Sequence, residues 1–233
     1  MRLSSNRWLR GLARAGASPY FPLLLLGAFL LFVFVRAMAS YSAALGSDPF
    51  GIVHFAGHLS RGMLFSDFPV YDWFKRDWAP GEAHFVLHGN YIADGQRLFC
   101  KYTIGFPLIL AGFIRVLGPG SVYFANVVVL VILLAAEYGL ARSFLRNFTG
   151  DRLLALIAPI LLMVLVNKIW GLALRPARDL SALALLVLGF YLGAVGLGRA
   201  PRLRWGAVGA GAFCLGFAGS VRFPNVLAAV PAF

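Results

Sequence analysis

Long apolar stretches separated by short polar segments dominate the chain. A stretch of about 20 residues, at 1.5 Å per residue in an α-helix, is long enough to cross a hydrocarbon core of roughly 30 Å. We expect membrane-spanning helices over residues 20–39, 122–141, 153–174, 180–198 and 205–221. The pattern predicts an all-α integral membrane protein, a polytopic helical bundle.

The spacing of these stretches predicts four parts of the chain. They are a basic N-terminus (1–19), a first transmembrane helix (20–39), a large outer loop (40–120) and a helical membrane bundle (121–233). A cleaved signal peptide is the alternative for the first span, and its long apolar run favours a retained anchor. The apolar tail 223–233 resembles the start of a sixth span and is too short to cross, so we expect a truncated chain.

Two segments of the outer loop have the pattern of amphipathic surface helices. Residues 105–117 are apolar, but 13 residues are too few to cross a bilayer, so we expect this helix at the membrane surface, with Arg115 toward the headgroups. After Asp48-Pro49, apolar residues follow at helical spacing, and Gly62 predicts the end of that helix. Turn signals between 66 and 102 predict a loop with little regular structure.

Small residues spaced by four occur in the last two predicted spans. One set is Gly189 and Gly193, and the other is Ala212, Gly216 and Ser220. Small residues let helices approach closely in lipid. We therefore expect these faces to be packing surfaces.

Composition excludes an ordinary soluble domain, and the placement of charge predicts the topology. Of the residues, 60% are hydrophobic and 13% are charged. The net charge of +12 is not gathered on one stripe, as nucleic-acid binding requires, so no nucleic-acid partner is expected. The basic residues alternate with the spans, which predicts cytoplasmic locations for Arg2, Arg7, Arg10 and Arg14, for Arg142, Arg146 and Arg152, and for Arg199, Arg202 and Arg204.

The same topology places segment 40–120 outside, where most of the acidic residues and all four histidines lie. His54 and His58 are four residues apart, which on a helix puts two imidazoles on one face, as zinc ligands require. No third ligand can be identified from the sequence. Polar loop histidines are the alternative, and a divalent metal is left open.

The order of these parts resembles the GT-C class of membrane glycosyltransferases, which use polyprenyl-phosphate sugars and include protein O-mannosyltransferases and aminoarabinose transferases. Ser47-Asp48-Pro49-Phe50 follows the first span, where these enzymes have the catalytic acid ahead of an amphipathic helix. Lys101-Tyr102-Thr103-Ile104-Gly105-Phe106-Pro107 lies where the family has a Lys/Tyr-Pro-Pro-Gly-Tyr-Pro-like motif, with Thr103 and Ile104 in place of prolines. A further acidic residue often opens a later span at the outer surface, as Asp179 does here. Such enzymes are longer, so the chain resembles their N-terminal portion.

The resemblance implies an inverting transfer of a sugar from a polyprenyl-phosphate carrier to a hydroxyl of a glycan, lipid or protein, in a bacterial inner membrane with the loop in the periplasm. Asp48 is the expected general base and Asp179 the second catalytic candidate. The candidates for binding the substrate or its phosphate are Lys101, Tyr102, Arg97, Arg175, Arg178 and Arg222. Helix capping is the structural alternative for both aspartates, and anchoring at the membrane interface is the alternative for the cations.

Two other classes of function compete with a transferase. A transporter or lipid flippase also needs many spans, and it should show broken helices or ionisable residues near mid-membrane. A noncatalytic assembly subunit would tolerate the change Asp48→Asn. The sequence identifies neither the sugar nor the acceptor.

Overall fold

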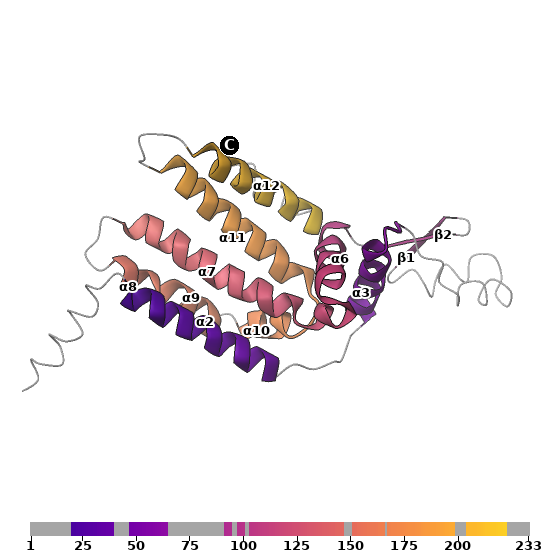
Figure 1. The fold of residues 1–233 in the computed structure, drawn as a ribbon, viewed down its shortest axis with the longest axis horizontal. Coiled ribbons are helices and arrows are strands. Elements are labelled where there is room, and N and C mark those ends of the chain that lie inside the picture. The colour runs from indigo at the N-terminus through magenta and orange to yellow at the C-terminus, as the bar shows by residue number, and fades with distance from the viewer. Residues whose placement is uncertain are drawn as a thin grey trace, which may run out of the picture.

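The computed structural model describes residues 20–39, 47–64, 91–94, 97–100, 103–146, 151–165, 167–198 and 204–222. For 47–50, 91–94, 97–100 and 167–168 it describes the backbone alone. The described part is a bundle of helices with one small hairpin (Figure 1). Its elements are α2 (Phe21–Ala39), α3 (Ser47–Ser60), β1 (Tyr91–Asp94), β2 (Arg97–Cys100), α6 (Gly105–Leu117), the 3-10 helix η1 (Pro119–Tyr123), α7 (Ala125–Leu145), α8 (Asp151–Ala155), α9 (Ile157–Leu165), α10 (Asn167–Ala173), α11 (Arg178–Leu197) and α12 (Trp205–Val221).

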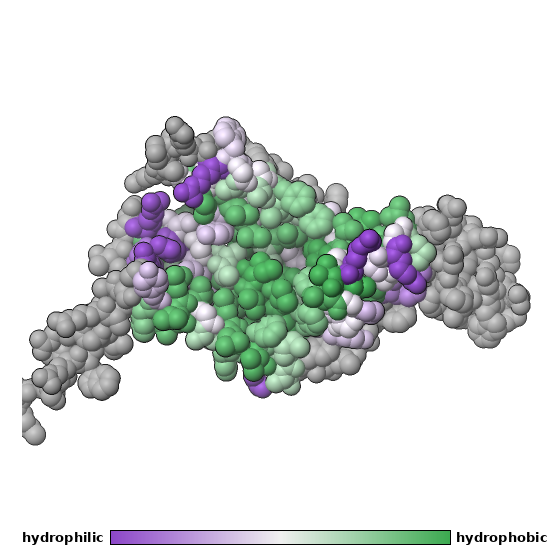
Figure 2. Space-filling model, in the orientation of Figure 1, coloured by the Kyte–Doolittle hydropathy of each residue, from purple (hydrophilic) through white to green (hydrophobic). Residues whose placement is uncertain are grey.

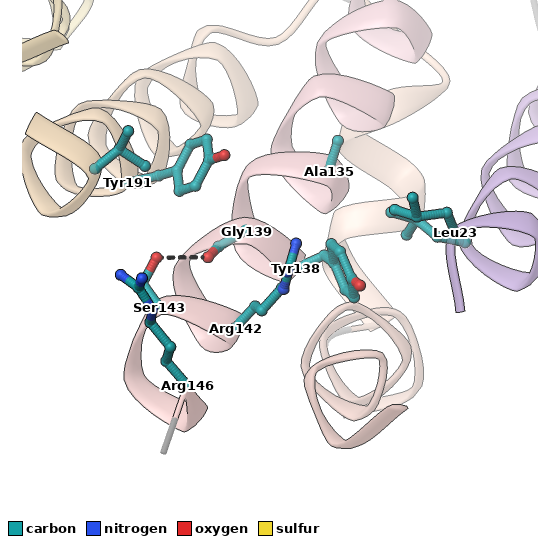
Figure 3. A pocket seen from close by; sticks show the side chains of 10 residues that line it. Leu23, Ala135, Tyr138, Gly139, Arg142, Ser143, Arg146 and Tyr191 are labelled. Atoms are coloured by element: carbon teal, nitrogen blue, oxygen red, sulfur yellow. Dashed lines mark hydrogen bonds between the residues drawn. The ribbon is translucent and has the colours of Figure 1, made fainter. Parts of the chain in front are cut away.

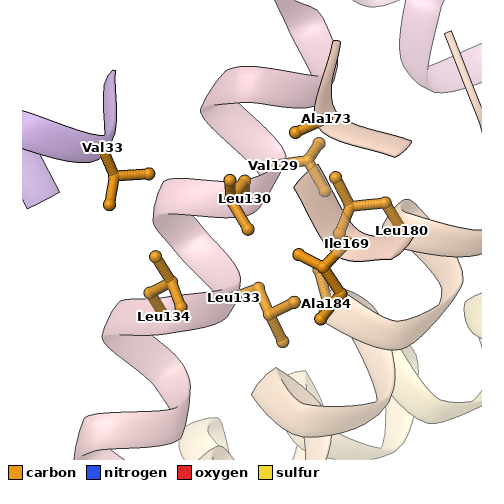
Figure 4. Close-up of a cluster of buried hydrophobic side chains, with 9 residues drawn as sticks. All are labelled: Val33, Val129, Leu130, Leu133, Leu134, Ile169, Ala173, Leu180 and Ala184. Atoms are coloured by element: carbon orange, nitrogen blue, oxygen red, sulfur yellow. The ribbon is translucent and has the colours of Figure 1, made fainter. Parts of the chain in front are cut away.

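Helix α7 lies at the centre of the bundle and has apolar side chains on most of its circumference. Its buried leucines and valines contact α2 on one side and α10 and α11 on the other (Figure 4). A helix that is hydrophobic all round is typical of a position surrounded by other helices. The cluster consists of Val33, Val129, Leu130, Leu133, Leu134, Ile169, Ala173, Leu180 and Ala184.

Three helices, α2, α7 and α11, are long and apolar enough to cross a membrane. Helix α12 is also apolar, and its 17 residues span about 25 Å. Large apolar side chains on the outside of the bundle are exposed, among them Leu24, Leu31 and Phe213. Figure 2 shows a broad apolar surface, with hydrophilic groups toward the two ends of the described surface. This distribution is typical of a protein that has lipid as its lateral solvent.

The third predicted span is not one helix, so that expectation was wrong. The segment forms α8, α9 and α10, and the helix is interrupted at Leu156, between Ala155 and Ile157. Pro159 lies in the first turn of α9, where a missing N–H is tolerated. Because lipid supplies no hydrogen bonds, the backbone groups freed at such breaks need partners from the protein.

The small residues of α11 pack against α12 as expected, but the packing face of α12 lies one residue from the predicted face. A Cβ built on Gly211 would lie 2.9 Å from the carbonyl oxygen of Gly189 and 3.0 Å from the nitrogen of Gly193, so the two backbones meet there. Gly216 is exposed, which contradicts its expected place in the interface. The contact face of α12 instead contains Gly211 and Leu215, one position before the predicted set.

The two short helices of the outer segment form as the sequence predicts. Helix α6 covers residues 105–117, and α3 ends at Ser60 before Gly62, whose φ of 81° is the left-handed conformation that favours glycine. Both helices lie side by side at one end of the bundle, across the direction of the long helices (Figure 1). Within the expected loop, β1 and β2 pair antiparallel from Tyr91↔Cys100 to Asp94↔Arg97, a hairpin that the turn signals did not predict.

Candidate functional site

The end of the bundle next to α3 and α6 brings together most of the candidate residues that the structure describes. The chain direction alternates, so this end contains the start of α7, the start of α11 and the end of α12 (Figure 1). A buried apolar cluster joins these helix ends to the two short helices. Its members are Ile52, Ala56, Phe106, Leu110, Ala125, Ala182 and Val221.

Asp179 and Arg222 form an ion pair, although 43 residues separate them in the sequence. The Arg222 Nη1 donates to Asp179 Oδ1 at 2.6 Å. Their side chains are 42% and 46% exposed, and pairs at such exposure contribute about 0–1 kcal/mol to stability. The pair therefore contributes little to the stability of the fold. It does hold a carboxylate and a guanidinium together at an accessible place between α11 and α12.

The start of α6 contacts the last turn of α12 directly. The Thr103 hydroxyl donates to the Val221 carbonyl at 2.7 Å, so the chain just before α6 binds the residue next to Arg222. At Gly105 a Cβ would lie 2.6 Å from the backbone carbon of Ser220, so only glycine permits this approach. These contacts position the Arg222 backbone.

No family model, curated protein or solved structure matches the chain. The chemistry of this site therefore has to be argued from its own residues.

Asp48 lies in the first turn of α3, which begins at Ser47. Its side chain is outside the described residues, so its expected roles as base or cap stay predictions. The backbone places it one helical turn, about 6 Å along the axis, before Ile52, which is in the same buried cluster as Ala182 and Val221. Ala182 is one turn beyond Asp179, and Val221 precedes Arg222.

Of the other phosphate-binding candidates, the structure describes the side chains of Arg178 and Arg175. Arg178 is partly buried in the first turn of α11, and Arg175 is exposed just before it. Arg97 lies in β2 with an undescribed side chain, and Lys101 and Tyr102 fall outside the described residues. The structure thus brings Arg178 and Asp179 to the same end as Arg222. The side chains of Arg97, Lys101 and Tyr102 are outside its description.

Sequence reasoning missed Asn126, which organises this end of the bundle. The side chain is 1% exposed, and its Nδ2 lies 3.0 Å from the Leu172 oxygen, 2.7 Å from the Arg175 oxygen and 2.9 Å from the Ala177 oxygen. The Leu172 carbonyl is in the last turn of α10, and the Arg175 and Ala177 carbonyls are in the turn between α10 and α11, before Asp179. The sequence does contain a signal for this residue, because a polar amide at the start of an apolar span is costly unless it has hydrogen-bond partners.

His54 and His58 face each other on α3, as their spacing predicts. Their Nε2 atoms are 3.4 Å apart and their ring centroids 4.7 Å apart. Among the described residues, no group of three His, Cys, Asp or Glu side chains is arranged to bind a metal. Structural and catalytic zinc sites take at least three protein ligands, so this pair alone does not form one.

The histidine pair makes stability depend on pH. Burial, and then the charges of His58 and Arg61, lower the pKa of His54 from its usual 6.5. Below that pH the unfolded chain binds a proton that the folded protein binds less readily, so we expect the free energy of unfolding to fall as the pH drops from 6.5 toward the lowered pKa. Thermal unfolding on either side of that pH measures the slope.

His54→Gln is expected to flatten this slope, because it removes the shifted group. His84→Gln serves as the control, because it also removes one histidine but leaves the pair on α3 intact. Equal slopes in the wild type and in His54→Gln would show that another group is responsible.

Proposed function

We propose that the protein is a membrane glycosyltransferase that moves a sugar from a polyprenyl-phosphate carrier to an acceptor hydroxyl at the outer face of a bacterial inner membrane. The supporting observation is the single buried cluster that joins α3 to the ends of α11 and α12. It places the helix that begins next to Asp48 against residues one turn or less from the Asp179–Arg222 pair. A carboxylate and a cation at one membrane face are what this transfer requires.

The proposed reaction is one displacement at the anomeric carbon. The acceptor oxygen forms the new glycosidic bond while its proton passes to the Asp48 carboxylate, and the bond from the anomeric carbon to the phosphate oxygen breaks. The electron pair leaves with the polyprenyl phosphate, so the sugar carbon inverts. No covalent intermediate on the protein is needed.

Arg222 is the proposed partner of the leaving phosphate. Its guanidinium is half exposed, so it is accessible to a ligand, and it is held through one Nη by Asp179. An arginine has five N–H donors in a planar fork, which leaves others for phosphate oxygens. In this scheme Asp179 is a positioning residue that orients the guanidinium. Arg178, in the same helical turn, adds positive charge at this end.

The two short helices provide a suitable place for a lipid carrier. Helix α6 buries Phe106 and Leu110 toward the bundle and leaves Leu108, Val116 and Leu117 exposed. A helix with one packed face and further exposed apolar side chains is typical of the membrane interface. A polyprenyl chain in the bilayer would then present its phosphate at the level of the helix ends.

The broken third span favours a second candidate, a transporter or lipid flippase. Discontinuous helices at membrane depth are typical of transport sites, and α8, α9 and α10 are such a segment. Reconstituted vesicles distinguish the two functions. A flippase moves labelled polyprenyl-phosphate sugar between leaflets without consuming it, whereas a transferase releases polyprenyl phosphate in proportion to the product formed. A noncatalytic subunit does neither.

Replacing Arg222 with glutamine tests the phosphate-binding role. We expect transfer from labelled polyprenyl-phosphate sugar to fall about tenfold or more, because a charge-assisted hydrogen bond to the leaving group is lost. The melting temperature should change little, since the ion pair is exposed. Arg204→Gln, at the opposite end of α12, is the matched control. Full transfer by Arg222→Gln would exclude this arginine from the reaction.

A further inference from the structure

A cavity of about 470 Å³ lies at the other end of the bundle, between α2, α7 and α11 (Figure 3). It is near the last turns of α7, at the end to which the sequence assigns the cytoplasmic arginines. It shares none of its lining residues with the candidate transferase site. Its volume is within the range of small-molecule sites, about 300–1,000 Å³.

Three side chains on one face of α7 give the cavity its chemistry. Tyr138, Arg142 and Arg146 are spaced by four residues, so they follow one another along the helix and all line the cavity. Tyr138 is 5% exposed, and its hydroxyl has no hydrogen-bond partner among the described residues. That hydroxyl is itself buried, and Tyr138 packs against Leu26, Ala155 and Leu156, so the tyrosine contributes its ring to the cavity wall.

Helix α11 closes the cavity with a second tyrosine. A Cβ on Gly139 would lie 2.5 Å from Cε2 of Tyr191, so this glycine lets the ring lie directly against α7. In Figure 3 the ring of Tyr191 lies over Gly139 with its hydroxyl toward the centre of the view, while Arg142 extends between α7 and the side of Leu23. The lining therefore combines hydroxyls, guanidinium groups and an apolar wall.

The cavity retains an excess of positive charge. The Nε of Arg142 lies 3.7 Å from Oδ2 of Asp151, which is an ion pair but too long for a hydrogen bond, so the donors of the guanidinium are left for a ligand. Arg146 is exposed at the mouth. Glu137 precedes Tyr138 in the sequence but does not line the cavity. Two cations and one carboxylate leave a net positive charge, which favours an anionic ligand.

We propose that this cavity binds the phosphate group of an anionic glycerophospholipid. The two arginines would bind the phosphate oxygens, because guanidinium groups donate to such acceptors. Leu23 and Leu26 of α2 form the apolar wall along which an acyl chain would lie. A basic pocket between membrane helices on the cytoplasmic side is the kind of site that anionic headgroups occupy. Inorganic phosphate has the same oxygens, but it has no acyl chain that could pack against the apolar wall.

Native mass spectrometry of the protein reconstituted with equal amounts of phosphatidylglycerol and phosphatidylcholine tests the proposal. We expect the wild type to retain phosphatidylglycerol preferentially. The double variant Arg142→Gln/Arg146→Gln should lose the preference by tenfold or more, and each single variant by about tenfold, the effect of one hydrogen bond to a charged group. The control Arg152→Gln/Arg204→Gln removes two charges at the same end outside the cavity lining and should keep it.

The single variants Arg142→Gln and Arg146→Gln keep the proposal testable if the double variant fails to fold, because each removes only one cation of the cavity. Retention of phosphatidylglycerol at the wild-type level by every variant that folds would overturn the proposal. A second arm titrates inorganic phosphate against the lipid. Protection from thermal unfolding by inorganic phosphate equal to that by phosphatidylglycerol would overturn the lipid as the occupant.

Discussion

Replacing Asp48 with asparagine is expected to reduce sugar transfer by roughly 10²–10⁴-fold, the contribution of a positioned general base. An acceptor hydroxyl is a weak nucleophile until its proton is accepted, and an amide cannot accept it as a carboxylate does. Stability should change little. Asp48 lies in the first turn of α3, where a negative charge near the helix N-terminus contributes about 0.3–1 kcal/mol, and asparagine is also favoured at helix starts.

Asp151→Asn is the matched control for this experiment. Asp151 also lies in the first turn of a helix, α8, but at the opposite end of the bundle from α3 (Figure 1). Transfer of radiolabelled sugar and the melting temperature are measured for both variants in the same membranes. If Asp48→Asn transfers sugar at the wild-type rate while the wild type is active, the assigned base is wrong.

The same residue tests the predicted sidedness. A cysteine at position 48 should react with a membrane-impermeant thiol reagent added from outside intact cells. Cys100 lies in the same outer segment, so it is replaced with serine for this experiment. Cys214 is buried in α12 and should stay unreactive under these conditions. Labelling of position 48 only after the membrane is opened would place α3 inside, and the proposed transfer could not then occur at the outer face.

The helices that the sequence predicts best are those with locally encoded boundaries. Helix α6 matches its predicted range, because an apolar run of 13 residues is followed by Gly118-Pro119-Gly120, where Gly118 has a φ of 87°. Helix α3 ends where Gly62 predicts. Turn signals and apolar runs act within a few residues, so no tertiary contact is needed to interpret them.

The features that the sequence does not predict depend on contacts between distant segments. The interruption between α8 and α9 lies in an apolar stretch that hydropathy alone cannot distinguish from one helix. The pairing of Asp179 with Arg222 depends on how α11 and α12 pack. The packing face of α12 lies one residue from the predicted face for the same reason. Small residues occur on both sides of α12, and only the close backbone contact at Gly211 shows which side packs against α11.

Replacing Asn126 with leucine should cause the largest loss of stability among the changes considered. Leucine has a similar volume but no donor, so the Leu172, Arg175 and Ala177 carbonyls would lose the Nδ2 contacts they have now. An amide group has two hydrogens, so about two full hydrogen bonds are lost, and each buried unsatisfied group costs about 1–3 kcal/mol. We expect the free energy of unfolding to fall by on the order of 3 kcal/mol, measured by thermal or denaturant unfolding in detergent.

Ser121→Ala provides the comparison, because Ser121 is equally buried and also donates to a carbonyl, that of Gly118. The Gly118 oxygen keeps a second donor, the Ser121 backbone N–H at 3.0 Å, so this change should cost little. The carbonyls that Asn126 contacts lie at the end of α10 and in the turn that leads to Asp179. The leucine variant should therefore also weaken transfer, because the start of α11 would be displaced. An Asn126→Leu protein as stable as Ser121→Ala would show that water or other backbone donors satisfy the α10–α11 turn.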